Sequence, residues 1–321
     1  MKKKLIIFIV IVQVAIVAFQ IFNILNARKR ILGIASSNAV DKKDVNFSQT
    51  GNLKYFYEPK PNSLRLDDSI GIGKGNYINS DSLNERFDYS VEKPDGVFRI
   101  ITLGDSITYG MHVATKDNWT ELLEDKLNSE LKCSNIKKFE VINLGVWGYD
   151  NQYSVERYRV RGQKYSPDLL LWYQANLLQA DEEINRLVYS YMETATKSAD
   201  YRQEDYQKIK FDNWIRSENE IYKKLGESKL LDLQKDAIYS LEKYYSGKIV
   251  FVEFPEMPLN HKEFLKQTLS ANKNYYLLDN TRDYLKEGGA VDASHPNKKG
   301  HQMISEDIFN FLKENNIVSC K

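Results

Sequence analysis

The chain has 321 residues, of which 42% are hydrophobic, so it can bury one large core or a core with a small accessory lobe. Its 45 Lys and Arg residues almost balance its 44 Asp and Glu residues. Proteins that bind nucleic acids usually carry a clear basic excess, so we expect no nucleic acid among the partners of this chain.

An apolar segment follows the three lysines at the start of the chain. Residues 5–25 are interrupted only by Gln13, Gln20 and Asn23. As a helix they would extend roughly 30 Å, which is the thickness of the hydrocarbon core of a bilayer. A cleaved signal peptide is the alternative, but its apolar region would normally span about 7–15 residues. We therefore predict a single-pass transmembrane anchor over residues 5–25, with residues 1–4 as a cytoplasmic N-terminus.

The distribution of basic residues hardly favours either orientation of this anchor, because basic residues flank both of its ends. A large domain can be translocated whatever its charge, so we expect an extracellular C-terminal domain at the membrane. Residues 26–50 are rich in Ser, Asn, Asp and Lys, and are predicted to form a stalk. Residues 51–95 contain Pro59, Pro61 and several glycines, which predicts an irregular extension packed on the main domain.

From residue 96 the sequence alternates between short apolar runs and segments with helical spacing. Apolar, often β-branched runs predict five buried strands, at 98–103, 139–144, 169–173, 248–254 and 275–278. Helices are predicted over 119–131, 151–165 and 298–312. Strands that alternate with helices favour an α/β fold with a mostly parallel sheet covered on both faces, which we assign to residues 96–318.

Residues 179–246 interrupt the alternation with a polar, Tyr-rich and largely helical insertion. The insertion follows the C-terminal end of a predicted strand, where open α/β sheets bind their ligands. It is therefore interpreted either as a lid or substrate platform, or as a helical buttress that contacts no substrate.

Two cysteines, Cys133 and Cys320, are too few for a disulfide framework and lack the spacing of a metal site. One bridge outside the cell and two unpaired thiols both remain open.

Gly104-Asp105-Ser106 stands where the first predicted strand ends. A nucleophilic serine needs an exposed hydroxyl, a nearby base and amide donors for the developing oxyanion. A strand-to-helix turn offers the hydroxyl and the donors together, because the first amides of a helix are unpaired. The alternative is a turn in which Asp105 or Ser106 only caps a helix.

Asp292-Ala-Ser-His295 lies near the other end of the chain. A histidine base must be held in one tautomer, commonly by a carboxylate that accepts a hydrogen bond from its other ring nitrogen. Within a tight turn Asp292 could reach back to the ring of His295. A surface loop with a helix cap is the alternative interpretation.

Four blocks together resemble the SGNH/GDSL hydrolase family. They are Gly104-Asp-Ser-Ile-Thr-Tyr-Gly110, Asn143-Leu-Gly-Val-Trp-Gly148, an Asn after the third strand, and Asp292-x-x-His295-Pro-Asn. The blocks occur in family order, and the resemblance covers about residues 96–316. It implies a three-layer α/β/α sandwich, flavodoxin-like in type, around a five-stranded parallel sheet.

The resemblance also implies roles for these residues. Ser106 would be the nucleophile, His295 the general base and acid, and Asp292 the residue that orients His295. The oxyanion donors would be the backbone amides of Ser106 and Gly148 and the side-chain amide of Asn176. Asp105 and Asn143 would support the reacting groups without taking part in the reaction themselves. No metal and no organic cofactor is implied.

One block departs from the family pattern. Where the family usually has Gly-x-Asn-Asp, this chain has Gln174-Ala-Asn176-Leu177. The donor of Asn176 is kept, but the missing Gly and Asp leave the shape of its loop open. The Gly-x-Ser-x-Gly elbow of the α/β-hydrolases is absent around Ser106.

The remaining histidines and two aromatic residues have both a packing interpretation and a site interpretation. His112, His261 and His301 are interpreted as packed or loop histidines, although His112 could line the cleft. Trp147 and Tyr149 flank Gly148 and could stack on a sugar ring, but ordinary packing is at least as good an interpretation.

The predicted function is that of a serine esterase acting on an ester-bearing small molecule or an acylated carbohydrate, for which deacetylation of a cell-surface glycan is the implied example. An O-acyltransferase that acts on an extracellular polysaccharide with the same triad is the first alternative. A catalytically silent glycan-binding or assembly protein is the second. The sequence does not indicate the acyl group or the oligomeric state.

Overall fold

The computed structural model describes residues 45–47, 53–65, 75–174 and 180–320. The predicted anchor at residues 5–25, most of the predicted stalk at 26–50 and Asn176 lie outside these ranges. Within the described ranges, no helix combines the length and the apolar character needed to cross a membrane.

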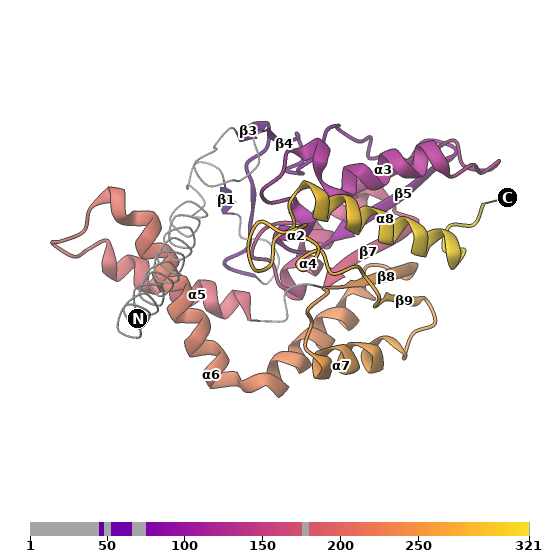
Figure 1. The fold of residues 1–321 in the computed structure, drawn as a ribbon. Helices are drawn as coiled ribbons and strands as arrows, with labels where there is room; N and C mark the ends of the chain where they lie inside the picture. Colours follow the sequence, from indigo (N-terminus) through magenta and orange to yellow (C-terminus); the bar gives the residue numbers. More distant parts are fainter. Residues whose placement is uncertain (1–44, 48–52, 66–74, 175–179, 321) are drawn as a thin grey trace, which may run out of the picture.

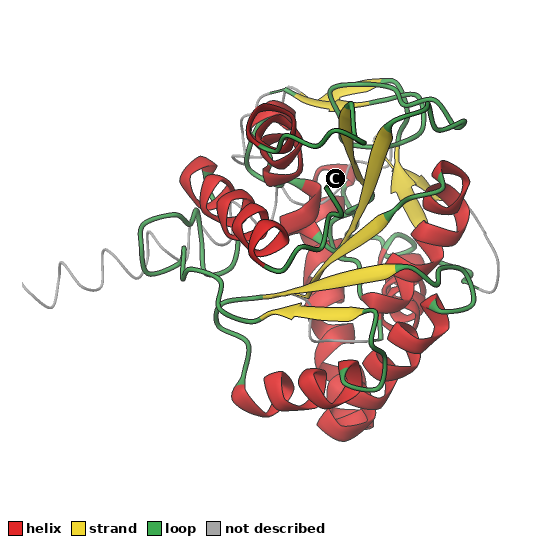
Figure 2. Ribbon diagram, turned by 90° about the vertical axis from the view of Figure 1, so that its right-hand side faces the viewer, coloured by secondary structure: helices red, strands yellow, loops and turns green. Residues whose placement is uncertain are grey.

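A five-stranded parallel sheet forms the centre of the fold (Figure 2). Its strands are β5 (Val97–Leu103), β6 (Lys138–Asn143), β7 (Leu169–Gln174), β8 (Lys248–Glu253) and β9 (Tyr275–Leu278). They lie in the order β6-β5-β7-β8-β9, and every neighbouring pair is parallel. This arrangement confirms the predicted sheet. In this topology the connections that follow β5 and β7 run to opposite sides, so the switch point of the sheet, where open α/β sheets bind ligands in a crevice, lies at the C-terminal ends of these two neighbouring strands.

Helices cover both faces of the sheet (Figure 1). One face packs on α3 (Trp119–Glu130) and α8 (Lys298–Glu314). The other packs on α4 (Asn151–Arg157), the C-terminal part of α6 (Tyr206–Leu241) and α7 (Leu259–Leu269). Successive strand residues alternate between the two cores, so that Ile100 faces α3 and α8 while Ile101 faces the opposite layer. The layers are therefore α/β/α.

The remaining helical segments are short. A single turn, α2 (Ser106–Tyr109), follows β5, and a 3₁₀ turn at Thr115–Asp117 precedes α3. The predicted helix over 151–165 is α4 continued by a π-helical segment at Tyr158–Gly162 and a 3₁₀ turn at Gln163–Tyr165.

The segment before β5 contains two antiparallel ribbons rather than only irregular chain. One pairs β1 (Val45–Phe47) with β2 (Tyr57–Pro59), and the other pairs β3 (Ser63–Arg65) with β4 (Asn76–Ile78). The buried carboxylate of Glu58 accepts hydrogen bonds from Arg157 and Arg161. These contacts hold the segment on the helical layer behind the sheet.

The insertion forms α5 (Asp181–Ala195), a 3₁₀ turn at Gln203–Asp205 and α6. Gly226, with φ of 74°, bends α6 within its length. α5 and the part of α6 up to Leu230 share a small core of their own, and the two helices extend beyond the sheet (Figure 1). Further along α6, Ile238 and Leu241 pack in the core of the sheet. The C-terminal part of α6 therefore belongs to the helical layer that covers the sheet.

A disulfide joins Cys133 to Cys320, with their Cα atoms 4.7 Å apart. Cys133 follows α3 and Cys320 lies in the tail after α8, so the bridge ties together the ends of two helices that pack on each other.

Reducing this bridge should lower the free energy of unfolding by roughly 2–4 kcal/mol, because the cross-link restricts the unfolded chain over a separation of 187 residues. Denaturant unfolding with and without dithiothreitol measures the difference. The double variant Cys133→Ser with Cys320→Ser is the control, and its unfolding midpoint should not respond to the reductant. Equal midpoints for the oxidised and reduced wild type would contradict the expectation.

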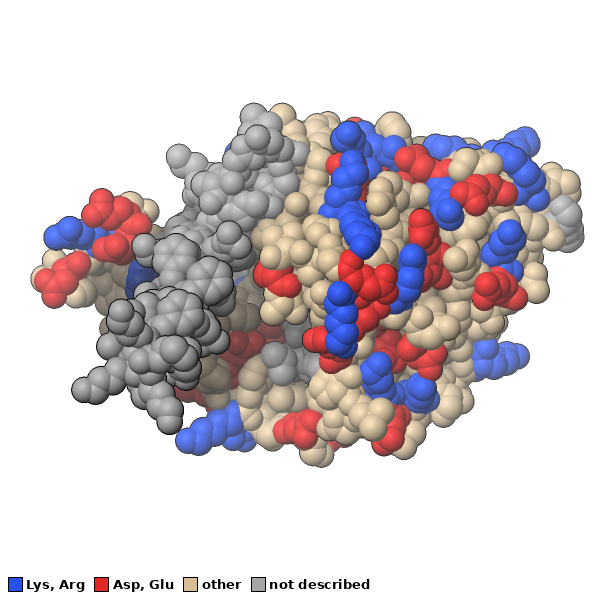
Figure 3. Space-filling model, viewed as in Figure 1, with Lys and Arg blue, Asp and Glu red and all other residues tan. Residues whose placement is uncertain are grey.

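Acidic and basic side chains are intermixed on the face shown in Figure 3, in keeping with the nearly balanced charge of the chain. Many of them pair, as Lys298 does with Asp117 at 2.9 Å.

Candidate active site

Ser106 is the first residue of α2, immediately beyond the C-terminal end of β5. Gly104 makes the sharp turn between strand and helix, with φ of 150°. A Cβ at this position would lie 2.3 Å from the hydroxyl oxygen of Thr108, so only glycine fits. Asp105 caps the helix, because its Oδ1 accepts a hydrogen bond of 2.9 Å from the amide of Ile107. The turn thereby presents the hydroxyl of Ser106 at the crevice.

The structure brings Ser106 and His295 together from opposite ends of the chain. The hydroxyl oxygen of Ser106 lies 2.9 Å from Nε2 of His295. On the other side of the ring, Nδ1 of His295 lies 2.9 Å from Oδ2 of Asp292. Nucleophile, base and orienting carboxylate are thus linked in one hydrogen-bonded row.

The turn that carries Asp292 and His295 is fixed by its own hydrogen bonds. Oδ1 of Asp292 accepts from the amides of Ser294 and His295, at 2.9 and 2.8 Å. The hydroxyl of Tyr284 donates to the carbonyl of Ser294 at 2.7 Å. Asn297 then caps α8 by accepting from the next helical amides. His295 therefore projects from a rigid support.

The carboxyl of Asp292 is held in its ionised form. Burial alone would raise its pKa, but the hydrogen bond and charge of His295 and the two amide donors outweigh burial, so the pKa is well below its usual range. An ionised Asp292 fixes the proton of His295 on Nδ1, which leaves Nε2 free to accept the proton of Ser106.

Asp105 has a different environment, although it precedes the nucleophile. Its side chain is buried, and burial raises its pKa to about 6, against the opposing effects of the Ile107 amide and His295. Its contact with the Ile107 amide makes it a helix cap, as the motif implies, and not the carboxylate that orients His295.

Gly148 lies in the loop after β6, and its neighbour Trp147 packs against Tyr109 of α2. Asn143, at the end of β6, supports both turns: its side-chain amide donates to the carbonyl of Thr108 at 2.9 Å, and its Oδ1 accepts from the amide of Gly145 at 2.8 Å. A Cβ on Gly145 would lie 2.5 Å from the backbone nitrogen of Tyr109, so the two turns are in direct contact. The candidate oxyanion donors Ser106 and Gly148 therefore sit on turns that are held together.

The third candidate donor, Asn176, lies outside the described residues. Gln174, at the end of β7, is buried, and its Oε1 accepts from the side-chain amides of Asn151 and Gln234. The start of that loop is therefore held by α4 and α6.

His112 is packed, with its side chain almost fully buried, and the group against which it packs is the triad. Its ring centroid is 5.1 Å from that of His295, and its Nε2 is 3.8 Å from Oδ2 of Asp292. Its φ of 71° is unusual for a residue other than glycine. Nothing in the sequence signals this backbone conformation, and the only hint was the short distance along the chain from Ser106.

His112, Asp292 and His295 also form the one group of donor atoms, among the residues described, that could hold a metal ion. Two imidazoles and a carboxylate would suit a zinc-like cation. Such an ion would occupy the carboxylate and imidazole that serve Ser106, so metal binding and the triad are alternative uses of the same atoms.

The other two histidines are structural, as expected from the sequence. His301 is buried in α8 and its Nδ1 accepts from the amide of Trp119 at 3.2 Å. Burial, with the nearby charges of His112 and His295, lowers the pKa of His301 to about 3, so it stays neutral. His261, on α7, pairs with Glu227 at 2.8 Å.

Of the two aromatic residues beside Gly148, Tyr149 is buried and Trp147 is partly exposed. The hydroxyl of Tyr149 donates to the carbonyl of Tyr57. Trp147 packs edge-on against Tyr109, with centroids 4.9 Å apart. Tyr149 is therefore a packing residue.

No protein-family model matches the sequence, and no curated protein matches it. Solved structures that match this chain include a two-domain esterase active on acetylated mannans, at 13% identity and a TM-score of 0.43, with 68% of this chain and 50% of that one covered. A catalytic mutant of an acetylxylan esterase from Geobacillus stearothermophilus matches at 13% identity and a TM-score of 0.41, and the match covers 70% of this chain and 96% of that one. A lipase/acylhydrolase from Enterococcus faecalis matches at 15% identity and a TM-score of 0.41, and the match covers 68% of this chain and 96% of that one.

This chain thus spans half the length of the two-domain esterase and almost all of the other two. The roles of Ser106, His295 and Asp292 rest on their own geometry.

Proposed function

We propose that this chain is a serine esterase that cleaves acyl esters with Ser106, His295 and Asp292. The observation that carries the proposal is the continuous row from the Ser106 hydroxyl through the His295 ring to Asp292, with both contacts at 2.9 Å. Ser106 and His295 are 189 residues apart in sequence, so local turn chemistry does not account for their meeting.

The reaction would follow two-step acyl transfer. His295 takes the proton of Ser106 while the Ser106 oxygen attacks the ester carbonyl. The tetrahedral oxyanion is held by the backbone amide of Ser106, at the start of α2, and by that of Gly148. His295 then protonates the leaving alcohol, which leaves an acyl-Ser106 intermediate. Water, deprotonated by His295, attacks this ester and releases the acid.

We place the catalytic domain outside the cell, anchored by residues 5–25. The apolar length of that segment supports an anchor. The Cys133–Cys320 bridge supports the orientation, because disulfides persist in oxidising compartments and are rare in the cytosol. An external site at the membrane favours an ester on a cell-surface glycan as substrate.

The experiment that tests the proposal is incubation of the purified external domain with acetylated oligosaccharides, with free acetate as the readout. We expect acetate release that saturates with substrate and is absent from the Ser106→Ala variant. If acetyl groups instead appear on an added unacetylated oligosaccharide, the O-acyltransferase alternative holds, because a glycan hydroxyl then replaces water in the second step. If the protein forms neither free acetate nor an acetylated oligosaccharide, and also does not hydrolyse a simple aryl ester, the esterase proposal is contradicted.

A further inference from the structure

The nucleophile is carried by a single helical turn, and this turn depends on other segments for its hydrogen bonds. The last carbonyls of any helix lack partners within the helix. In α2, the carbonyls of Thr108 and Tyr109 are satisfied by three asparagine side chains. Asn118 donates to both carbonyls at 3.0 and 3.2 Å, Asn143 donates to Thr108 at 2.9 Å, and Asn84 donates to Tyr109 at 2.6 Å.

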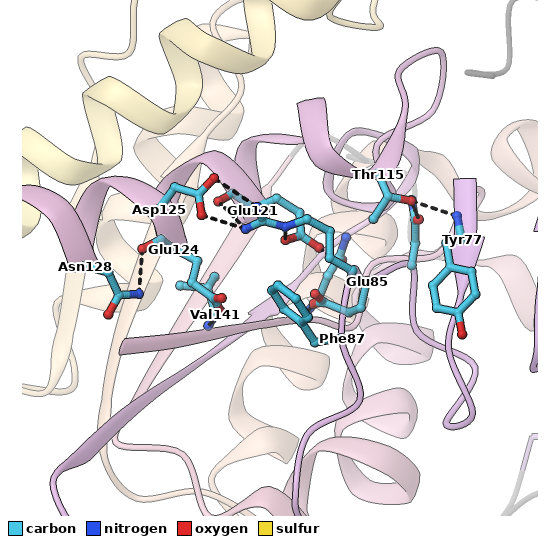
Figure 4. A network of polar contacts seen from close by, with 12 residues as sticks. Tyr77, Glu85, Phe87, Thr115, Glu121, Glu124, Asp125, Asn128 and Val141 are labelled. Atoms are coloured by element: carbon cyan, nitrogen blue, oxygen red, sulfur yellow. Dashed lines mark hydrogen bonds and ion pairs between the residues drawn. The ribbon is translucent and has the colours of Figure 1, made fainter. Parts of the chain in front are cut away.

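Asn84 comes from the segment before the sheet and is almost fully buried, with 1% of its surface exposed. Its Oδ1 accepts a hydrogen bond of 2.5 Å from the hydroxyl of Thr115. That hydroxyl oxygen in turn accepts from the amide of Tyr77 in β4 at 2.8 Å, as Figure 4 shows. With its oxygen used by Thr115, the amide nitrogen of Asn84 must face the carbonyl of Tyr109.

The next residue, Glu85, reaches the same turn indirectly. Its fully buried carboxylate accepts from the backbone amide of Asn143 and from the hydroxyl of Tyr89. Figure 4 shows Glu85 beside Glu121 and Glu124 of α3. Burial and the neighbouring carboxylates raise the pKa of Glu85 well above its usual range. Burying this group costs free energy that its hydrogen bonds offset, and the bond from the Asn143 amide fixes the asparagine that links both catalytic turns.

We infer that Asn84 and Glu85 are positioning residues for Ser106, and that the segment around them completes the catalytic unit. His295 is anchored separately, by Asp292 and α8, so its distance from Ser106 depends on what holds α2. Asn84 holds the end of α2 directly, and Glu85 acts on it through Asn143. Misplacement of a reacting group by about 1 Å can cost about 10²-fold in rate. This inference rests on the proposed role of Ser106.

The test compares Asn84→Ala with Asn128→Ala. Asn128, on α3, also makes two backbone hydrogen bonds to Phe139, at 2.9 and 3.0 Å, but contacts neither catalytic turn. We expect Asn84→Ala to lower kcat roughly 10- to 100-fold, with KM within about threefold of the wild type, and Asn128→Ala to change neither by that much. The rate at which a fluorophosphonate labels Ser106 should fall in parallel with kcat.

Conservative variants separate positioning from general folding. Glu85→Gln keeps an acceptor for the amide of Asn143 and should retain most of kcat, whereas Glu85→Met should lose it. If Asn84→Ala does not fold, the test uses Asn84→Asp instead, because an aspartate side chain has the same shape as asparagine. Its kcat relative to wild type should decrease as the pH rises, because only a protonated Asp can donate to the Tyr109 carbonyl.

Wild-type rates of labelling and turnover in the folded Asn84 variant would overturn the inference while leaving the esterase proposal intact. Absence of Ser106 labelling in the wild type would instead remove the proposed function on which the inference rests.

Discussion

Replacing Ser106 with alanine should lower kcat/KM for ester hydrolysis by at least about 10⁴-fold without unfolding the protein. The hydroxyl is the only atom group of Ser106 that reaches Nε2 of His295, and its loss removes the covalent path. Initial rates on a chromogenic acetate ester, with unfolding curves for both proteins, measure the effect.

Ser294→Ala is a suitable control, because the hydroxyl of Ser294 also contacts His295, but at Nδ1 and at 3.2 Å. Losing this peripheral contact should cost less than about tenfold in kcat/KM. If the two serine variants lose similar activity, or if Ser106→Ala keeps wild-type turnover, Ser106 is not the nucleophile.

The second large effect is expected for Asp292→Asn, which should lower kcat by about 10⁴-fold with little change of shape. An asparagine amide can donate to Nδ1 of His295, which forces the ring proton onto Nε2. His295 then donates to Ser106 and cannot accept its proton. Asp283→Asn, in the same loop region but paired with Lys286, is the control and should keep nearly full activity.

The pH dependence of the wild type follows from the lowered pKa of Asp292. Since that carboxylate stays ionised through the mildly acidic range, a loss of activity there should not come from protonation of Asp292. We expect kcat/KM to fall as the pH is lowered from about 8 to about 5. A flat profile over that range would count against His295 as the base.

Much of the core could be predicted because its signals are local. Buried parallel strands appear as short apolar runs, and the predicted run at 98–103 differs from β5 by one residue. The last helix begins at Lys298 as predicted, after the Asn297 cap, and extends two residues beyond the predicted end at 312. Ser106 was predicted as the nucleophile from the resemblance of four blocks to a known family, because Gly104-Asp-Ser alone also fits a helix cap.

The features that were missed depend on contacts between distant parts of the chain. His112 reaches Asp292 across 180 positions of sequence and does so from a left-handed backbone conformation, which no periodicity reveals. Asn84 contacts Tyr109, and Tyr57 donates to the carbonyl of Trp147 at 2.6 Å, from a segment that its composition marked only as turn-rich. The pairing of Cys133 with Cys320 was undecided for the same reason.

The insertion illustrates a further limit of sequence patterns. Its helical character was evident, but its two ends pack differently, and its role as a lid, a substrate platform or a buttress stays a prediction. Ile238 and Leu241 at the end of α6 support the sheet, while α5 and the beginning of α6 form a separate cluster beyond the sheet. The packing partners, and not the spacing of apolar residues, show that the change from one cluster to the other falls between Leu230 and Ile238, after the bend at Gly226.

The most direct test of the central claim is to react the native protein with a fluorophosphonate and locate the adduct by peptide mass spectrometry. We expect one stoichiometric adduct on Ser106, lost in Ser106→Ala and formed much more slowly in Asp292→Asn. An adduct on another residue, or equal labelling of wild type and Ser106→Ala, would contradict the assignment of Ser106, His295 and Asp292 as the catalytic triad.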